Sequence, residues 1–283
     1  MVVLRGVAEP HPFSMTRVCA SRTTGRSISM SESSVSHSML VAELGQYWDR
    51  YAGSLQDGQL TSKVTLDELE LCVGHLEYVL KANESINLTR ITDPHEAAIL
   101  HIYDSLVLLP YVDGAPKGKL LDIGTGAGFP GLPLAITSHR PSVLMDSVGK
   151  KVKVVEACAS QLGVELVRTV HERVESYALS HRGEFSVVVA RAVAHLSTLV
   201  EYASPLLKKD GLLVVSKGVP DADEVSDGTY AAHVCGFDTP LRYDLSLPGK
   251  RGARAIFVFK KSHKPSMKLP RAVGMSKKHP ISK

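Results

Sequence analysis

The segment from Leu120 to Gly131, LLDIGTGAGFPG, constrains the fold of this chain more than any other part of the sequence. It is typical of an apolar strand that ends near an acidic residue and enters a turn with alternating glycines. Gly124, Gly126 and Gly128 permit positive φ angles, and without a Cβ the backbone can approach a ligand closely. Residues 131–136 then predict a helix whose free N–H groups face that ligand. The segment therefore predicts a strand, a turn and a helix that receive a nucleotide-like cofactor.

Two acidic residues bear on the identity of that cofactor. The stretch from Gly126 to Gly131 also matches the dinucleotide pattern G-x-G-x-x-G. Asp122 lies two residues before Gly124. A carboxylate at this place would repel a pyrophosphate but suits the amino-acid end of S-adenosylmethionine, either directly or by anchoring the turn. Asp146 follows about 20 residues later, where a ribose-binding carboxylate is expected, and does not distinguish the two cofactors because both contain a ribose. An ordinary turn without a ligand is the remaining interpretation.

Strands and helices alternate after the glycine turn. Apolar runs predict four strands, at 142–146, 164–170, 185–190 and 212–217, and two helices between them, at 150–162 and 195–207. Near-continuous apolar strands of this kind are buried on both faces of a mostly parallel sheet. Two last strands, 243–247 and 255–259, are expected to form an antiparallel pair. The predicted fold class is α/β: a Rossmann-like class I methyltransferase fold with a seven-stranded, mostly parallel sheet and an N-terminal helical extension.

Three helices are predicted before the glycine turn. The first has apolar residues at helical spacing between 40 and 51. The second opens with Thr65 and Glu68, which match a capping box. The third opens with Asp93 as N-cap and Pro94 at the first helical position.

Composition divides the chain into four expected parts. Residues 1–38 are rich in Arg and Ser and lack periodicity, which indicates a disordered or mis-assigned N-terminal extension, with an organelle transit peptide as the alternative. We expect an N-terminal helical cap at 39–110, a methyltransferase domain at 111–261 and a basic C-terminal tail at 262–283.

The four cysteines are scattered without a C-x-x-C pair, and no apolar run is long enough to span a bilayer. The expected location is therefore the cytoplasm.

The charge of the chain is unevenly distributed. From Lys250 to Lys283 there are eleven Lys or Arg residues and no Asp or Glu, whereas the whole chain carries only +4. Residues 1–249 must therefore carry −7. A basic tail on an acidic body indicates contact with the phosphate backbone of a nucleic acid. A solvated tail that only aids solubility is the alternative.

Six segments together resemble the RsmG family, also called glucose-inhibited division protein B. They are NLTRITDP at 87–94, HIYDS at 101–105, DSVGKK at 146–151, ARAVA at 190–194, SKG at 216–218 and LPRAVGMSKKHPI at 269–281. With the glycine turn, the resemblance covers about residues 40–281 in the order and spacing of the family. Two positions depart from the pattern: Ala127 stands where many members have proline, and Met275 where many have threonine.

The resemblance implies that the chain transfers a methyl group from S-adenosylmethionine to N7 of one guanine in 16S ribosomal RNA. The expected partner is this RNA or the small ribosomal subunit, with no metal, no membrane and a monomeric enzyme. Guanine N7 has an in-plane lone pair and no proton, so its methylation needs alignment rather than a general base. A nicotinamide-dependent oxidoreductase and a noncatalytic RNA-binding protein are the alternatives.

The resemblance and the positions of the strand ends predict three groups of site residues. The cofactor-binding group is Asp122, Gly124, Gly126, Gly128, Phe129, Asp146, Val174, Glu175 and Arg191. The catalytic candidates are Arg191 and Lys217, and the candidates for RNA phosphate contacts are Lys150, Lys151, Arg251, Arg254, Arg271, Lys277 and Lys278.

Simpler roles remain open for several of these residues. Arg191 could instead form a structural ion pair, Lys217 could be a surface lysine, and Glu175 could be a solvated residue of a first helical turn. His101 and Asp104 share a helix face, and we expect them to support the glycine turn by hydrogen bonds rather than to bind a metal.

Overall fold

The structure, a computed structural model, describes residues 35–54 and 62–283. Val35–Lys283 forms one compact unit. Residues 1–34 of the expected N-terminal extension at 1–38 lie outside the described residues. Within 35–54 and 62–283, no helix is both long and apolar enough to cross a membrane.

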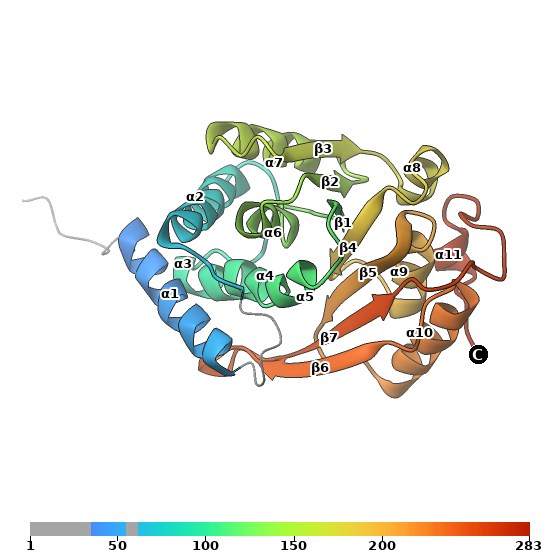
Figure 1. The fold of residues 1–283 in the computed structure, drawn as a ribbon. Coiled ribbons are helices and arrows are strands. Elements are labelled where there is room, and N and C mark those ends of the chain that lie inside the picture. Colours follow the sequence, from blue (N-terminus) through green and yellow to red (C-terminus); the bar gives the residue numbers. More distant parts are fainter. Residues whose placement is uncertain (1–34, 55–61) are drawn as a thin grey trace, which may run out of the picture. The chain divides into compact units, whose positions relative to one another are not determined.

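The centre of the fold is a seven-stranded sheet with the order β3-β2-β1-β4-β5-β7-β6 (Figure 1). Its strands are β1 Lys119–Ile123, β2 Ser142–Asp146, β3 Val167–His171, β4 Phe185–Arg191, β5 Leu207–Lys217, β6 Leu241–Ser246 and β7 Ala253–Lys260. The first five run parallel, and β7 runs antiparallel to both β5 and β6. The fold class expected from the sequence is confirmed, including the antiparallel pair at one edge.

Helices cover both faces of this sheet (Figure 1). One face is covered by α6 Gly131–Ser138 and α7 Gly149–Gln161; α2 Leu66–Asn83 packs on these two helices, and α1 His37–Ser54 packs on α2. The other packs against α8 Val174–Ser180, α9 Leu196–Ala203 and α10 Ala222–Val234. Strands buried between two helical layers are necessarily apolar on both sides, which explains the near-continuous hydrophobic runs of β1, β2 and β4.

Two helix starts have the predicted capping geometry. At α2, the Glu68 amide donates to Thr65 Oγ1 at 3.3 Å and the Thr65 amide donates to Glu68 Oε2 at 2.7 Å. At the next helix, the Glu96 amide donates to Asp93 Oδ1 at 2.8 Å. Each contact satisfies an amide that has no partner inside its own helix.

The third predicted helix takes an unexpected form. α3 Pro94–Ala97 continues into a π-helical segment, η1 Ala98–Tyr103, and then into α4 Asp104–Leu106 and α5 Leu109–Asp113. The carbonyls of Leu100 and His101 accept from Arg191 of the distant β4. A local sequence pattern could not predict this feature, because the partner lies about 90 positions away in the chain.

The basic C-terminal segment, expected as a tail at 262–283, packs against the rest of the unit. Leu269 is 3% exposed, and its carbonyl accepts from Arg182 at 2.7 Å. The short helix α11 Met275–Lys278 packs against α9, and the Ser276 carbonyl accepts from Thr198. The segment therefore lies along the helices that follow β3 and β4.

Candidate cofactor site

The glycine turn is tied to the end of the neighbouring strand β2. The amides of Gly124 and Thr125 both donate to the carbonyl of Met145 at 2.9 Å. The amide of Gly126 donates to Asp146 Oδ2, and the amide of Val148 donates to Asp146 Oδ1, each at 2.9 Å. The first three contacts hold the turn at the carboxyl edge of the sheet, where open α/β folds bind ligands, and the fourth fixes the Asp146 carboxylate.

Asp122 lies behind the turn. Its side chain is fully buried, and its Oδ2 accepts from the Gly131 amide at 2.9 Å, at the start of α6. Burial raises the pKa of this carboxyl group to about 7, and the hydrogen bond from Gly131 opposes that shift. Asp122 does not line the cavity described below, so its position fits the anchoring role rather than direct ligand contact.

Phe129 is held between two histidines. Its ring centroid lies 4.2 Å from that of His75 and 4.8 Å from that of His101, in stacked geometry. His75 Nε2 lies 2.8 Å from the carbonyl oxygen of Ala127, so this nitrogen is the donor and carries a proton. A Cβ at Gly128 would lie 2.7 Å from the same nitrogen, which explains why this position takes a glycine.

Both histidines are uncharged at neutral pH. Burial lowers the pKa of His75 to about 4. Burial, together with the charge of Arg191, lowers the pKa of His101 to about 3. The glycine turn therefore rests on a neutral aromatic stack, to which His101 adds a hydrogen bond between its Nε2 and Thr89 Oγ1 at 2.8 Å.

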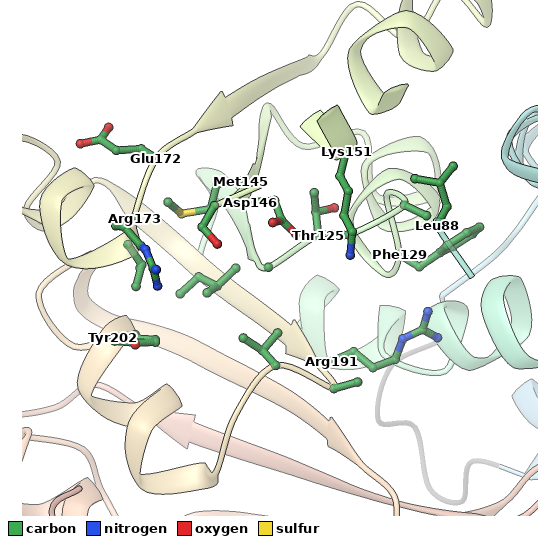
Figure 2. A pocket seen from close by; sticks show the side chains of 18 of the residues that line it. Leu88, Thr125, Phe129, Met145, Asp146, Lys151, Glu172, Arg173, Arg191 and Tyr202 are labelled. Carbon is green, nitrogen blue, oxygen red and sulfur yellow. Dashed lines mark hydrogen bonds between the residues drawn. The ribbon is translucent and has the colours of Figure 1, made fainter. Parts of the chain in front are cut away.

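A cavity of about 360 Å³ opens over the turn and the ends of β1, β2 and β4 (Figure 2). Its lining includes seven of the nine predicted cofactor residues: Gly124, Gly126, Phe129, Asp146, Val174, Glu175 and Arg191. Asp122 and Gly128 lie behind it. Lys151 extends from α7 toward this cavity (Figure 2), and Lys277 also lines it. Its volume lies within the range of small-molecule sites.

Arg191 at the end of β4 joins the sheet to the helical segment. Its Nη1 donates to Asp104 Oδ2 at 3.1 Å and to the carbonyls of Leu100 and His101 at 3.2 and 3.3 Å. Asp104 is 2% exposed, and its Oδ1 accepts from Arg254 Nε of β7 at 2.9 Å. Arg191 thus forms a structural ion pair, which is the simpler role that the sequence left open, and it also lines the cavity.

A second cavity adjoins the first. It measures about 410 Å³ and is lined by residues from the ends of β4, β5 and β7, including Lys217 and Arg254, and by residues of η1 and α4, including Asp104. The two cavities share His101, Arg191 and Ala192. Lys217 lines only the second one; its Nζ lies 2.7 Å from Glu224 Oε1 and donates to the Ala194 carbonyl at 3.0 Å.

The predicted RNA-contacting residues fall into two groups. Three arginines pair with carboxylates inside the unit: Arg251 with Glu96, Arg254 with Asp104, and Arg271 with Glu201. The four lysines, Lys150, Lys151, Lys277 and Lys278, form no ion pair within residues 35–54 and 62–283. The same described ranges contain no group of side chains that could hold a metal ion.

Comparison with known proteins shows the family of this chain. Residues 68–242 match the family model "rRNA small subunit methyltransferase G". The chain belongs to this family. It is 37% identical over 215 residues to a protein of that name from Lactobacillus helveticus, covering 73% of this chain and 88% of the relative. It is 36% identical over 233 residues to that from Bacillus licheniformis, covering 81% and 96%.

A solved structure shows a more distant likeness. The 1,6-didemethyltoxoflavin-N1-methyltransferase of Burkholderia thailandensis is 18% identical and aligns over 73% of this chain and 97% of its own, with a TM-score of 0.47.

Membership of the methyltransferase G family confirms the expected family and enzyme class. S-adenosylmethionine is the cofactor of this class, so the expected cofactor is confirmed as well. An oxidoreductase and a noncatalytic RNA-binding protein are thereby set aside.

The roles of the individual site residues stay predictions. Sequence reasoning missed the contributions of His75, Leu88 and Tyr202, because a single His, Leu or Tyr in a helix or loop carries no local signal.

Replacement of Gly124 by alanine tests the turn. Gly124 has φ +74°, and a Cβ there would lie 2.7 Å from Val193 Cγ2. We expect Gly124→Ala to weaken S-adenosylhomocysteine binding about tenfold, because left-handed backbone costs an L-residue roughly 1–2 kcal/mol and the turn must shift. Isothermal titration calorimetry measures this change. The control is Gly163→Ala, which has φ +68° and open space around its Cβ; equal affinities of the two variants would contradict the assignment.

The pH dependence of stability tests the neutral stack. Between pH 6.5 and 4 the unfolded chain protonates His75 and the folded chain does not, so the wild type loses stability as the pH falls. The His75→Gln variant retains an N–H donor for Ala127 but lacks this titration. We expect the difference in unfolding free energy between the two proteins to change by about 2 kcal/mol between pH 7.5 and 5. Urea titrations measure it, and parallel pH profiles would refute the buried neutral histidine.

Proposed function

We propose that this chain transfers the methyl group of S-adenosylmethionine to N7 of a guanine in 16S ribosomal RNA. The observation that carries this proposal is the pair of adjoining cavities that share His101, Arg191 and Ala192 at the carboxyl edge of the sheet. One cavity contains the glycine turn and suits the cofactor. The other is open, lies beside it and suits the acceptor base.

We assign different residues of the cofactor cavity to the methionine end, the ribose and the adenine of S-adenosylmethionine. We expect the turn from Gly124 to Phe129 to contact the methionine end of the cofactor, and Val174 and Glu175 to lie beside the adenine. Each Asp146 oxygen accepts one backbone N–H and retains a lone pair for a ribose hydroxyl. When bound, S-adenosylmethionine supplies a methyl group on a positively charged sulfur.

The acceptor cavity fits a nucleophile that carries no proton. Asp104 is bound by two arginines, Lys217 is paired with Glu224, and His101 has its pKa lowered to about 3. None of these groups is available as a general base at neutral pH. Guanine N7 needs none, so positioning supplies the rate advantage, up to roughly 7–11 kcal/mol. Arg191 and Lys217 then act by fixing the walls that align the base.

Basic side chains around these cavities are proposed to contact RNA phosphates. We assign Lys150, Lys151, Lys277, Lys278, Arg251, Arg254 and Arg271 to this role. The lysines should contribute more than the arginines, whose guanidinium groups already hold carboxylates. The proposed substrate is the RNA itself or the small ribosomal subunit, and the enzyme is proposed to act as a monomer in the cytoplasm.

Methyl transfer to ribosomal RNA tests this function. Purified protein is incubated with methyl-labelled S-adenosylmethionine and either naked 16S RNA or small ribosomal subunits that lack the modification. Chemical cleavage at N7-methylguanine then maps the product. We expect label at a single guanine with about one methyl per RNA. Label at another atom, or no transfer by a protein that binds the cofactor, would contradict the proposal.

Replacement of Lys217 tests its positioning role. Lys217→Met removes the hydrogen bond to Ala194 and the ion pair with Glu224. We expect kcat to fall about tenfold, since a charge-assisted hydrogen bond contributes roughly 1.5–3 kcal/mol, with cofactor affinity unchanged because Lys217 does not line that cavity. Lys217→Arg should restore part of the rate. The control Lys209→Met, at an exposed position on the same strand, should retain full activity; an equally active Lys217→Met would disprove the role.

A further inference from the structure

A third cavity shares no lining residue with the two that form the proposed methyl-transfer site. It measures about 470 Å³ and lies between α1, the segment from η1 to α5, and β6. Five tyrosine rings line it: Tyr47, Tyr51, Tyr103, Tyr111 and Tyr243. The whole chain has nine tyrosines, so more than half of them gather at this one place. The proposed methyl transfer uses none of them.

The tyrosine rings contact one another in two groups. The ring centroids of Tyr111 and Tyr243 lie 4.9 Å apart, and Tyr103 lies 6.0 Å from Tyr47 and 6.2 Å from Tyr51. Burial raises the pKa values of Tyr103 and Tyr111 to about 12, still further above neutral pH, so both phenols are uncharged. Tyr243 is 37% exposed, which leaves part of its ring open to a ligand.

The charges around this cavity favour an anionic ligand. Arg50 lines the cavity, is exposed and has no carboxylate partner within the described residues. The one acid in the lining, Asp244, is bound by Arg242, whose Nε lies 3.0 and 3.1 Å from its two oxygens. The acid is therefore compensated, whereas the positive charge of Arg50 remains available.

The tyrosine cavity is connected to the acceptor cavity through shared elements. Tyr103 directly precedes Asp104, which lines the acceptor cavity, so their Cα atoms lie about 3.8 Å apart. Across the sheet edge, Leu245 of the tyrosine cavity pairs with Arg254 of the acceptor cavity. Paired residues project from the same face of a sheet. An RNA chain that reaches one cavity therefore has the other within its immediate neighbourhood.

We propose that the tyrosine cavity binds an unpaired nucleobase of the substrate RNA, apart from the base that is methylated. The base stacks on the open ring of Tyr243, and Arg50 contacts the adjacent phosphate. Stacking on aromatic rings beside a cation is the common mode of single-strand recognition. The inference rests on the proposed function in one respect, that the ligand of this protein is RNA.

Substitutions at two exposed residues, Tyr243 and Arg50, test this second base site. We expect Tyr243→Ala to weaken binding to small ribosomal subunits about tenfold, because stacking contributes roughly 1–3 kcal/mol per base. Tyr243→Phe should bind like the wild type, since it keeps the aromatic face. Arg50→Ala should weaken binding and lower its dependence on salt concentration. Filter binding at several salt concentrations measures all three, and titration with S-adenosylhomocysteine should show unchanged cofactor affinity.

The matched control is Tyr230→Ala, because Tyr230 is 42% exposed on α10 and lies outside this cavity. If both Tyr243→Ala and Arg50→Ala bind subunits as tightly as Tyr230→Ala, the proposed base site is wrong. Should Tyr243→Ala also lose cofactor affinity, Arg50→Ala decides, because Arg50 is exposed and is not part of the buried core. Methyl transfer by the wild type is measured in parallel. If the wild type transfers methyl groups and the variants bind subunits normally, only the base site is refuted. If the wild type transfers no methyl group and the variants bind subunits more weakly, only the methyl transfer is refuted.

Discussion

The buried carboxylate of Asp104 is the contact on which the site depends. It accepts from Arg191 of β4 on one oxygen and from Arg254 of β7 on the other, at 3.1 and 2.9 Å. A buried charge without partners would cost several kcal/mol, so the three groups must be brought together when the chain folds. Because Arg191 lines both adjoining cavities, this ion-pair cluster fixes the wall between them.

The helices that precede the sheet are part of the site. His75 of α2 and His101 of η1 enclose Phe129 of the glycine turn, and His75 also donates to the turn at Ala127. The turn is therefore held on one side by the sheet, through Asp146, and on the other by the helical layer. This arrangement explains how a turn rich in glycine, which by itself has many conformations, keeps one shape.

Local sequence patterns predicted the elements well where the physical signal is local. The capping residues Thr65 and Asp93 start helices as expected, and the strand at 142–146 has the predicted ends. Contacts between distant parts of the chain gave no such signal. The pairing of His75 with Ala127 spans 52 positions and that of Asp104 with Arg254 spans 150, so packing alone reveals them. The charge of the C-terminal segment was visible in the sequence, but its ordered packing against α9 was not.

The central claim is that one cavity binds the cofactor, the adjoining one binds the acceptor base, and the two meet at Arg191. A crystal structure with S-adenosylhomocysteine and guanosine monophosphate is its most direct test. We predict S-adenosylhomocysteine over the turn from Gly124 to Phe129. We also predict the guanine in the cavity beside Lys217, with N7 directed toward the sulfur. S-adenosylhomocysteine bound elsewhere, or a guanine whose N7 faces away from the sulfur, would contradict the claim.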